Sequence, residues 1–517
     1  MMSWPHWIIV PIVLPLLAGG LLLLIEQRSL ALARAVSLLS TLALLAVAAG
    51  LMAHAAGGRI EAYLLSNWQA PFGIALALDR LSALMLALTA LVALAALLYA
   101  RGGTDARGPH FHALFQIQLM GLNGAFLTAD LFNLFVFFEV LLIASYGLLL
   151  HGAGAARLRA SVHYVTFNLT GSALFLIAVA LLYGVTGTLN MADLAERIEW
   201  AGPQNAALIQ AAGLLLLVVF CVKAALLPLY FWLPDTYAAA TAPVAALFAI
   251  MTKVGVYAIA RIYTLIFGDS GGVAADLAQP WLPWLALGTL LLAAIGVLAA
   301  VQLRGLIAYL VVASAGTLLL ALGLGTEQTL AAALFYMVPS TLMAAALFLL
   351  GHLVHLRRND AGDSLLGGQW HGPRERLGVL FFICAVSAAG MPPLAGFLGK
   401  AQLLQGAAQS AMPVATFTVV LLSSLALVLA LARAGSSLFW RTEVGAQTAA
   451  AVPRTQTAAV ALLAAGLVAL PVVAGPLATY TSDAAAQLLE RRQYLDAVLH
   501  KAPAAPAWNV REGMVKE

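Results

Sequence analysis

Three lysines lie inside long apolar stretches of the chain, namely Lys223, Lys253 and Lys400. The other two, Lys501 and Lys516, fall in the polar C-terminal tail, whereas the loops between apolar stretches carry arginine. A buried lysine can lose its proton, and an arginine effectively cannot. Lysines reserved for places where a charge is costly therefore favour proton-transfer chemistry in an apolar environment.

One acidic residue belongs to the same set. Glu139 is the only acid in the apolar stretch 131–150, and an unpaired charge at mid-membrane costs at least about 2.5–3.5 kcal/mol. A nearby lysine would offset this cost, so we expect Glu139 to pair with Lys223. Separation of the pair would then let the lysine release its proton. A static salt bridge is the alternative.

The remaining candidates are less tightly constrained. Lys253 lies early in the stretch 242–266, where it can relay a proton from Lys223 or extend its ammonium to the membrane surface. Lys400 has no evident acid in its own part of the chain. It is expected to be a terminal proton site or to pair with an acid on another subunit. His163 is a candidate for a water chain.

The composition is that of a membrane protein. Of the 517 residues, 63% are hydrophobic and 9% are charged, against about 25% charged residues in ordinary globular chains. Cys221 and Cys384 lie in apolar stretches, which argues against a disulfide framework. The sequence has no metal-spaced Cys/His cluster, Walker loop or dinucleotide-binding glycine motif, so no cofactor or metal is expected. The loop arginines are topology signals, not a nucleic-acid footprint.

We expect an all-α polytopic fold with fourteen transmembrane helices, because apolar stretches of roughly 20 residues recur along the chain and strand-like alternation is absent. The expected spans are 7–25, 30–53, 76–99, 112–130, 131–150, 162–185, 206–228, 242–266, 282–303, 305–325, 329–353, 376–396, 412–437 and 455–476. Arginines concentrate in the odd-numbered connections, which the positive-inside rule assigns to the cytoplasm, with both termini outside. The tail after residue 482 is expected to be an amphipathic helix on the membrane or a neighbour, or partly disordered.

Two of these helices, 206–228 and 376–396, are expected to break. The prolines concerned are Pro228 and Pro234 in the first, and Pro392 and Pro393 in the second. Proline removes a backbone donor and clashes with the preceding turn. Interrupted helices in matching positions of two halves indicate a transport site, although prolines also kink transmembrane helices without such a role.

The positions of the breaks suggest a division of the chain. Five-helix repeats over 112–266 and 282–437 would place each break in the fourth helix of its unit, with one lysine beside it. A three-helix segment, 1–111, precedes the repeats. A last transmembrane helix and polar tail, 438–517, follow them.

Two strings carry a resemblance to a known family. They are Phe-Val-Phe-Phe-Glu-Val-Leu-Leu-Ile-Ala-Ser-Tyr around Glu139 and Lys-Ala-Ala-Leu-Leu-Pro-Leu-Tyr-Phe-Trp-Leu-Pro from Lys223. The chain resembles the antiporter-like subunits shared by respiratory complex I and the Mrp (Pha/Mnh) cation/proton antiporters, and is most similar to the D-type subunit of the latter. This resemblance implies fourteen helices, two inverted repeats and broken seventh and twelfth helices.

The resemblance also implies a function. The family's proton-translocating residues match Glu139, Lys223, Lys253 and Lys400. The chain would be a secondary-transporter subunit in a bacterial inner membrane, with other subunits as partners, protons and Na+ or K+ as cargo, and no cofactor. The alternatives are a proton-pumping membrane subunit of a complex I-like NADH:quinone oxidoreductase or membrane-bound hydrogenase, and a structural partner with a vestigial path.

One position sorts the chain from a relative, and another departs from the family's pattern. A closely related complex I subunit carries glutamate where Lys400 stands. Family members usually have a histidine near Phe-Tyr-Met-Val-Pro-Ser-Thr-Leu, where this chain has Pro339. If that histidine relays protons in the second repeat, water, Ser340 or Thr341 must do so here.

Overall fold

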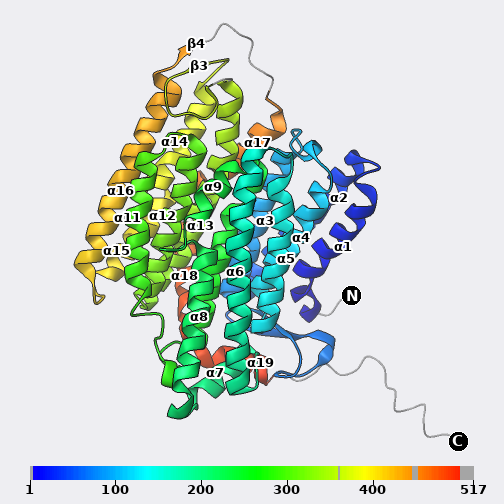
Figure 1. Cartoon of the computed structure of the whole chain (residues 1–517), viewed down its shortest axis with the longest axis vertical. Helices are drawn as coiled ribbons and strands as arrows, with labels where there is room; N and C mark the ends of the chain where they lie inside the picture. The colour runs from blue at the N-terminus through cyan, green and yellow to red at the C-terminus, as the bar shows by residue number, and fades with distance from the viewer. Residues whose placement is uncertain (1–3, 359–360, 445–451, 501–517) are drawn as a thin grey trace, which may run out of the picture.

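Most helices of the protein run side by side along its longest axis (Figure 1). The computed structural model describes residues 4–358, 361–444 and 452–500. Ten helices in this part of the chain are long and apolar enough to cross a membrane, or eleven if one bent pair is counted as a span. The protein is therefore mostly helical and passes the membrane many times, as its composition predicts.

The helices of the first half begin near the N-terminus and end shortly after Lys253. They are α1 (Val10–Ile25), α2 (Leu30–Ala55), α3 (Arg80–Ala100), α4 (Phe111–Leu127), α5 (Leu131–Leu150), α6 (Ala155–Thr186), α7 (Met191–Glu199), α8 (Ala206–Ala224), α9 (Trp232–Ala239) and α10 (Ala242–Leu265). The short α9 follows the expected first break.

The second half continues in the same manner. Its helices are α11 (Leu282–Ala299), α12 (Leu303–Gly323), α13 (Glu327–Arg357), α14 (Glu375–Ala389), α15 (Ala395–Ala407), α16 (Pro413–Gly435), α17 (Arg454–Ala469), α18 (Ala474–Leu489) and α19 (Arg491–Leu499). Every expected span overlaps one of the helices of the two halves. Short helical turns are η1 (Trp4–Ile8), η2 (Leu65–Asn67), η3 (Asp105–Arg107), η4 (Pro203–Asn205), η5 (Gly272–Ala274) and η7 (Ser436–Trp440).

The expectation of a purely helical chain needs a correction, because the connections contain four short strands. β1 (Glu61–Leu64) pairs antiparallel with β2 (Ala75–Leu78), and β3 (Gln369–Trp370) pairs parallel with β4 (Glu443–Val444). Strands of two to four residues are too short to give a recognisable alternation of polar and apolar residues.

The centre of the bundle is formed by α10 and α13, whose apolar stretches are completely buried. Helix α13 packs against α10, α12, α14, α15, α17 and α18, and so joins the two halves. Pro339 lies inside α13, which nevertheless continues as one helix from Glu327 to Arg357. By contrast, only 33% of the apolar window of α2 is buried, and this helix presents leucines to its surroundings, as expected of a face toward lipid.

The loops gather at opposite ends of the bundle, with β3 and β4 at one end and α7 and α19 at the other (Figure 1). At the first end, Arg34 lies 2.6 Å from Asp105 and Arg304 lies 3.1 Å from Asp363. Burial raises the pKa of Asp105, but hydrogen bonds from Arg34 and His112 outweigh this effect and lower that pKa to about 2. The odd-numbered connections thus contact one another through charged pairs.

The opposite end is closed by the C-terminal residues. Arg491 lies 2.8 Å from Glu199, and Asp483 lies 3.0 Å from Arg80. The tail after residue 482 was expected to be an amphipathic helix on the membrane or a neighbour, or partly disordered, and its described part is helical. Helix α18 packs against α13, α3 and α10, and α19 packs against α7, where Arg491 also donates to the Ser270 carbonyl. Residues 501–517 of the tail lie outside the described part.

An ion pair inside the bundle ties α3 to α10. Arg261 Nη2 lies 2.5 Å from an Asp79 carboxylate oxygen, and both side chains are buried. Asp79 also accepts a hydrogen bond of 2.8 Å from the backbone N–H of Ser82, which caps α3. The rings of Tyr257 and Tyr494 lie 5.6 and 5.1 Å from the guanidinium carbon. This pair therefore connects three distant parts of the chain.

Loss of the buried charge should be costly. Removing one partner of a buried ion pair destabilises a protein by about 3–5 kcal/mol, because the other charge is left uncompensated. We expect Asp79→Asn to lower the thermal unfolding midpoint of the purified protein clearly. The control Asp193→Asn removes a partly exposed pair with Arg197 on α7, for which less than about 1 kcal/mol is expected. Equal shifts in both variants would contradict this assignment.

Candidate functional site

The first helix break lies between α8 and α9. Helix α8 ends at Ala224, and Ala225 adopts a left-handed conformation with φ of 57°. The Leu227 N–H donates to Thr289 Oγ1 at 2.9 Å, and Trp232 Nε1 donates to the Val222 carbonyl at 3.0 Å. Protein groups thus satisfy the irregular backbone, as membrane depth requires.

The two prolines of this region occupy different positions. Pro228 lies in the break, between the two helices. Pro234 lies in the first turn of α9, where backbone N–H groups have no partner within the helix and the missing donor costs little. The interruption is therefore centred on Pro228, and Pro234 belongs to the helix that resumes after it.

Lys223 lies in the last turn of α8, immediately before this break. Its ammonium donates to Asn168 Oδ1 at 3.1 Å and to the Asn168 carbonyl at 3.5 Å. A cation at a helix C-terminus interacts favourably with the negative end of the helix dipole. The lysine is only 8% exposed. The hydrogen bonds to α6 and the dipole of its own helix offset the cost of burying its charge.

Glu139 is positioned by the neighbouring helix and is partly buried. It lies on α5 and accepts a hydrogen bond from Ser172 Oγ on α6. The expected direct ion pair is not formed: among the described residues, no contact within 4.0 Å joins the Glu139 carboxylate to the Lys223 ammonium. The two charges instead contact α6 at Ser172 and Asn168, one helical turn apart, because each finds a polar group there.

A small cavity of about 20 Å³ lies beside this lysine. Its lining includes Lys223 and Asn168, Tyr164 of α6, and Met251 and Val254 of α10. The volume is sufficient for one water molecule, which needs two to four polar partners. The cavity therefore lies between the first break and the helix that carries the next lysine, and Lys223 and Asn168 are polar residues in an otherwise largely apolar wall.

Lys253 lies on α10 and is completely buried. Its ammonium donates to Ser314 Oγ on α12 at 2.7 Å, and Ser314 donates to the Val311 carbonyl at 2.8 Å. Within the described part of the chain, no carboxylate lies within 4.0 Å of this ammonium. Lys253 is thus held at the junction of the two halves, and its ammonium does not extend to a surface.

The second break separates α14 from α15, with Pro392 and Pro393 between them. Lys400 follows on α15 and is 8% exposed. Its ammonium donates to the carbonyl of Ala389, the last residue of α14, at 3.1 Å and to Ser424 Oγ on α16 at 3.0 Å. Although this lysine follows its break in sequence, its charge returns to the C-terminal end of the helix before it.

The three residues considered for a water chain are placed separately. His163 lies on the exposed face of α6. Ser340 and Thr341 are buried on α13, and both donate to the Met337 carbonyl, at 3.2 and 2.7 Å. The structure does not bring His163 into contact with the lysines, and the two hydroxyls are turned toward their own helix.

Three polar residues of the site were not recognised from the sequence. Asn168, Ser172 and Ser424 supply acceptors or donors to the buried charges. Asn168 and Ser172 stand four residues apart, which places them on one helix face. That spacing in an apolar span was the available signal, but many transmembrane helices carry small polar residues without such contacts.

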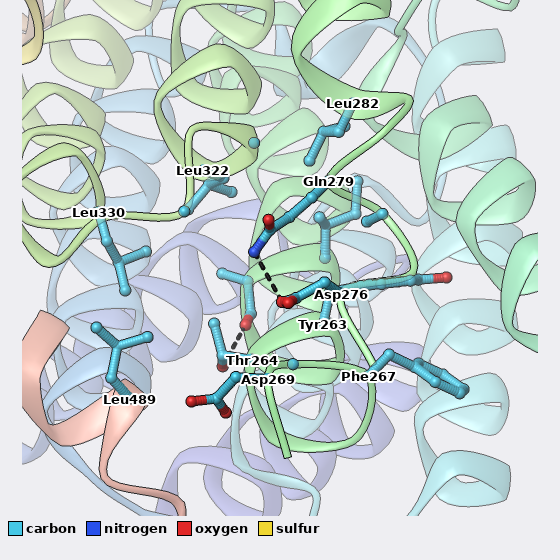
Figure 2. A pocket seen from close by; sticks show the side chains of 16 residues that line it. Tyr263, Thr264, Phe267, Asp269, Asp276, Gln279, Leu282, Leu322, Leu330 and Leu489 are labelled. Carbon is cyan, nitrogen blue, oxygen red and sulfur yellow. Dashed lines mark hydrogen bonds between the residues drawn. The ribbon is translucent and has the colours of Figure 1, made fainter. Parts of the chain in front are cut away.

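A larger cavity, of about 250 Å³, lies elsewhere in the molecule, between the ends of several helices (Figure 2). Figure 2 shows Asp276 and Asp269 at its wall, and Gln279 donates to Asp276 at 2.7 Å. Leu322 and Leu489 close other sides. None of the described residues that line this cavity is a candidate for proton translocation.

Close packing fixes the spacing between the first two lysines. Gly255 on α10 lies directly against the end of α8, so that a Cβ at this position would meet the Ala224 backbone nitrogen at 2.5 Å. Backbone atoms cannot move aside as a flexible side chain can. Since Lys253 is two residues from this contact and Lys223 is next to Ala224, the contact determines how far apart the two lysines are.

We therefore expect Gly255→Ala to lower the thermal stability of the protein, because α10 must move away from the break. Gly184→Ala on α6 is the control, since a Cβ there meets nothing within 4 Å. This control should be neutral or slightly stabilising, by up to about 1 kcal/mol. Unfolding midpoints of the purified variants test the expectation, and a Gly255→Ala protein as stable as the control would refute it.

Comparisons with known proteins agree with this architecture. A family model described as NADH:quinone oxidoreductase/Mrp antiporter, TM, matches residues 128–426. The chain is 43% identical to the D-type subunit of a probable K(+)/H(+) antiporter of Rhizobium meliloti (strain 1021), over 98% of this chain and 99% of that one. It is 36% identical to the D-type subunit of an Na(+)/H(+) antiporter of Bacillus subtilis (strain 168), over 96% and 99%.

Chains of several solved membrane complexes have a similar fold. A chain in the "Structure of Mrp complex from Dietzia sp. DQ12-45-1b" superposes with a TM-score of 0.86 at 26% identity, over 96% of this chain and 100% of that one. A chain of "Respiratory complex I from Thermus thermophilus with bound NADH" superposes with a TM-score of 0.79 at 25% identity, over 94% and 99%.

Proposed function

Since the chain belongs to the NADH:quinone oxidoreductase/Mrp antiporter family of membrane proteins, we propose that it is the D-type subunit of a complex that exchanges Na+ or K+ for protons. The observation that carries this proposal is the similarity to D-type antiporter subunits along nearly the whole chain. The chain acts as one subunit of a multi-subunit complex in the bacterial cytoplasmic membrane, and is a transporter subunit with no catalytic centre of its own.

The proton path of this proposal uses Glu139, Lys223, Lys253 and Lys400 in that order. Its support is the set of contacts around each charge. The first two residues meet at α6, and the small cavity beside Lys223 reaches α10. Lys253 contacts α12 across the junction of the halves. A lysine at each break can change its protonation state, because its acceptors are neutral groups that do not fix the charge.

The architecture of the proposal has fourteen spans, with inverted repeats at 112–266 and 282–437. The flanking parts are the N-terminal segment 1–111 and the C-terminal part 438–517. Support comes from the overlap of every expected span with a helix and from the two interrupted helices α8–α9 and α14–α15. The arginine-rich end, which carries β3 and β4, faces the cytoplasm, and both termini lie outside.

Cysteine labelling tests this orientation. Cys221 and Cys384 are both buried. We therefore expect a maleimide label to react with an introduced surface cysteine and not with these two. We expect Gln69→Cys to react with a membrane-impermeant maleimide added to intact spheroplasts. Gly367→Cys, at the arginine-rich end where a Cβ meets nothing within 4 Å, should react only in everted vesicles. The reverse pattern would contradict the orientation.

The complex I-like alternative has its own support in the fold similarity to a respiratory complex I chain. A direct experiment separates the two. The complete complex is expressed in everted vesicles, a pH gradient is formed, and its dissipation on addition of Na+ or K+ is followed with a dye. Dissipation without an electron donor supports antiport, whereas transport that requires NADH or another donor supports the alternative.

Substitutions in the same vesicles test the path. We expect Glu139→Ala and Lys223→Ala each to reduce cation-dependent proton exchange by at least about tenfold. Lys223→Arg keeps the positive charge but cannot release its proton, so it should also lose exchange. Lys501→Ala removes a lysine charge from the polar tail and serves as the control.

The arginine variant separates a proton-releasing lysine from a static one. Full exchange in Lys223→Arg would favour a structural role for the charge. Full exchange in both alanine variants would leave the chain as a structural partner with a vestigial path. Western blotting of the assembled complex ensures that equal amounts of protein are compared.

A further inference from the structure

The connection between Glu139 and Lys223 depends on a single hydroxyl. Ser172 Oγ is hydrogen-bonded to the Glu139 carboxylate and also lies 3.0 Å from the Asn168 carbonyl. The same carbonyl lies 3.5 Å from the Lys223 ammonium, which makes its shorter bond to Asn168 Oδ1. Ser172 and Asn168 are 4% and 1% exposed, so water does not readily replace these contacts.

A serine hydroxyl has one proton to donate and two lone pairs to accept with. An ionised carboxylate only accepts, so Ser172 must donate to Glu139 in that state. A protonated carboxyl donates to Ser172 Oγ instead, and this frees the hydroxyl proton for the Asn168 carbonyl. The direction of the Ser172 hydroxyl therefore follows the protonation state of Glu139.

The orientation of the Ser172 hydroxyl toward the Asn168 carbonyl affects Lys223. The Asn168 carbonyl has two lone pairs, and the Ser172 N–H of the same helix occupies one of them. When the Ser172 hydroxyl also donates to this carbonyl, it competes with the Lys223 ammonium for the second. When Glu139 is ionised, the hydroxyl turns to the carboxylate and the carbonyl is available to Lys223 again. The charge state on α5 thus alters the hydrogen bonds of the lysine on α8, although the two ions do not touch.

We propose that Ser172 and Asn168 are positioning residues that couple Glu139 to Lys223 through this hydrogen-bonded bridge on α6. The inference rests on the proposed proton path. It adds the residues through which protonation of Glu139 alters the hydrogen bonds of Lys223. Ser172 is hydrogen-bonded to the Glu139 carboxylate, and its hydroxyl reorients when that group is protonated. Asn168 accepts hydrogen bonds from the Lys223 ammonium. Asn168 is itself fixed, because its Nδ2 donates to the Tyr164 carbonyl at 2.9 Å.

Helix α6 offers a matched control for this bridge. Thr170 Oγ1 donates to the Thr166 carbonyl at 2.9 Å, the same bond to the preceding turn that Ser172 makes to Asn168. Thr170 lies on the exposed side of the helix. Deleting its hydroxyl therefore removes an equivalent bond within the helix but leaves the contacts of Glu139 unchanged.

The test uses the complete complex in everted vesicles, with cation-dependent proton exchange as the readout. Ser172→Ala should reduce the exchange rate about tenfold or more, since a hydrogen bond to a charged group is lost. Ser172→Cys replaces the hydroxyl with a weak donor of similar shape and should show a comparable loss. Ser172→Thr retains the hydroxyl and should restore most of the rate. Thr170→Ala should exchange at the unmodified rate.

Glu139→Ala and Lys223→Ala are measured in parallel to separate two kinds of failure. If these two lose exchange while Ser172→Ala and Ser172→Cys keep it, the bridge is wrong and the proton path stands. If Glu139→Ala itself keeps full exchange, the path is wrong and the bridge fails with it. Equal loss in Ser172→Thr and Ser172→Ala, in equally assembled complexes, would overturn the role of the hydroxyl.

Discussion

The three lysine ammoniums in the described part of the chain are held by neutral oxygen atoms, and this requirement governs the arrangement around each of them. Lys400 places its charge on the last carbonyl of α14, a helix that stops inside the bundle, where the helix dipole and unpaired carbonyls favour a cation. Lys223 stands in the last turn of α8, and its ammonium donates to Asn168 on α6. Lys253 finds a hydroxyl on a neighbouring helix. A carboxylate in direct contact would hold a lysine charged more firmly, whereas neutral acceptors leave both protonation states accessible.

The helix breaks and the buried lysines therefore depend on each other. At the second break, the end of α14 supplies a carbonyl to the Lys400 ammonium, and that ammonium satisfies the carbonyl at membrane depth. The surrounding helices complete the arrangement, since α11 satisfies the backbone at the first break and Gly255 lets α10 lie directly against it. In the second break, Gly390 has φ of +70°, and a Cβ there would meet the Lys400 side chain at 2.6 Å, so glycine is required for the lysine to return to Ala389.

The sequence was sufficient for the helices, the two breaks and the buried lysines, because apolar length, proline and isolated charge are local properties. It was insufficient for contacts between helices. The expected ion pair of Glu139 with Lys223 is replaced by a link through Asn168 and Ser172, which depends on how α5, α6 and α8 face one another. The pair of Asp79 with Arg261 was missed for the same reason, since 182 residues separate them. The short strands were missed because they are formed by loop contacts.

Because α18 and α19 close one end of the bundle, the contacts at that end form late. Arg80 meets Asp483 and Arg261 meets Tyr494, so these residues acquire their partners only after α18 and α19 have been synthesised. Until then, the buried charge network of α3 and α10 lacks its last aromatic neighbour. Contacts over such sequence separations form late because loop closure must precede them. A chain truncated before α18 is therefore expected to insert into the membrane but remain open at this end, and so to be a substrate for membrane proteases.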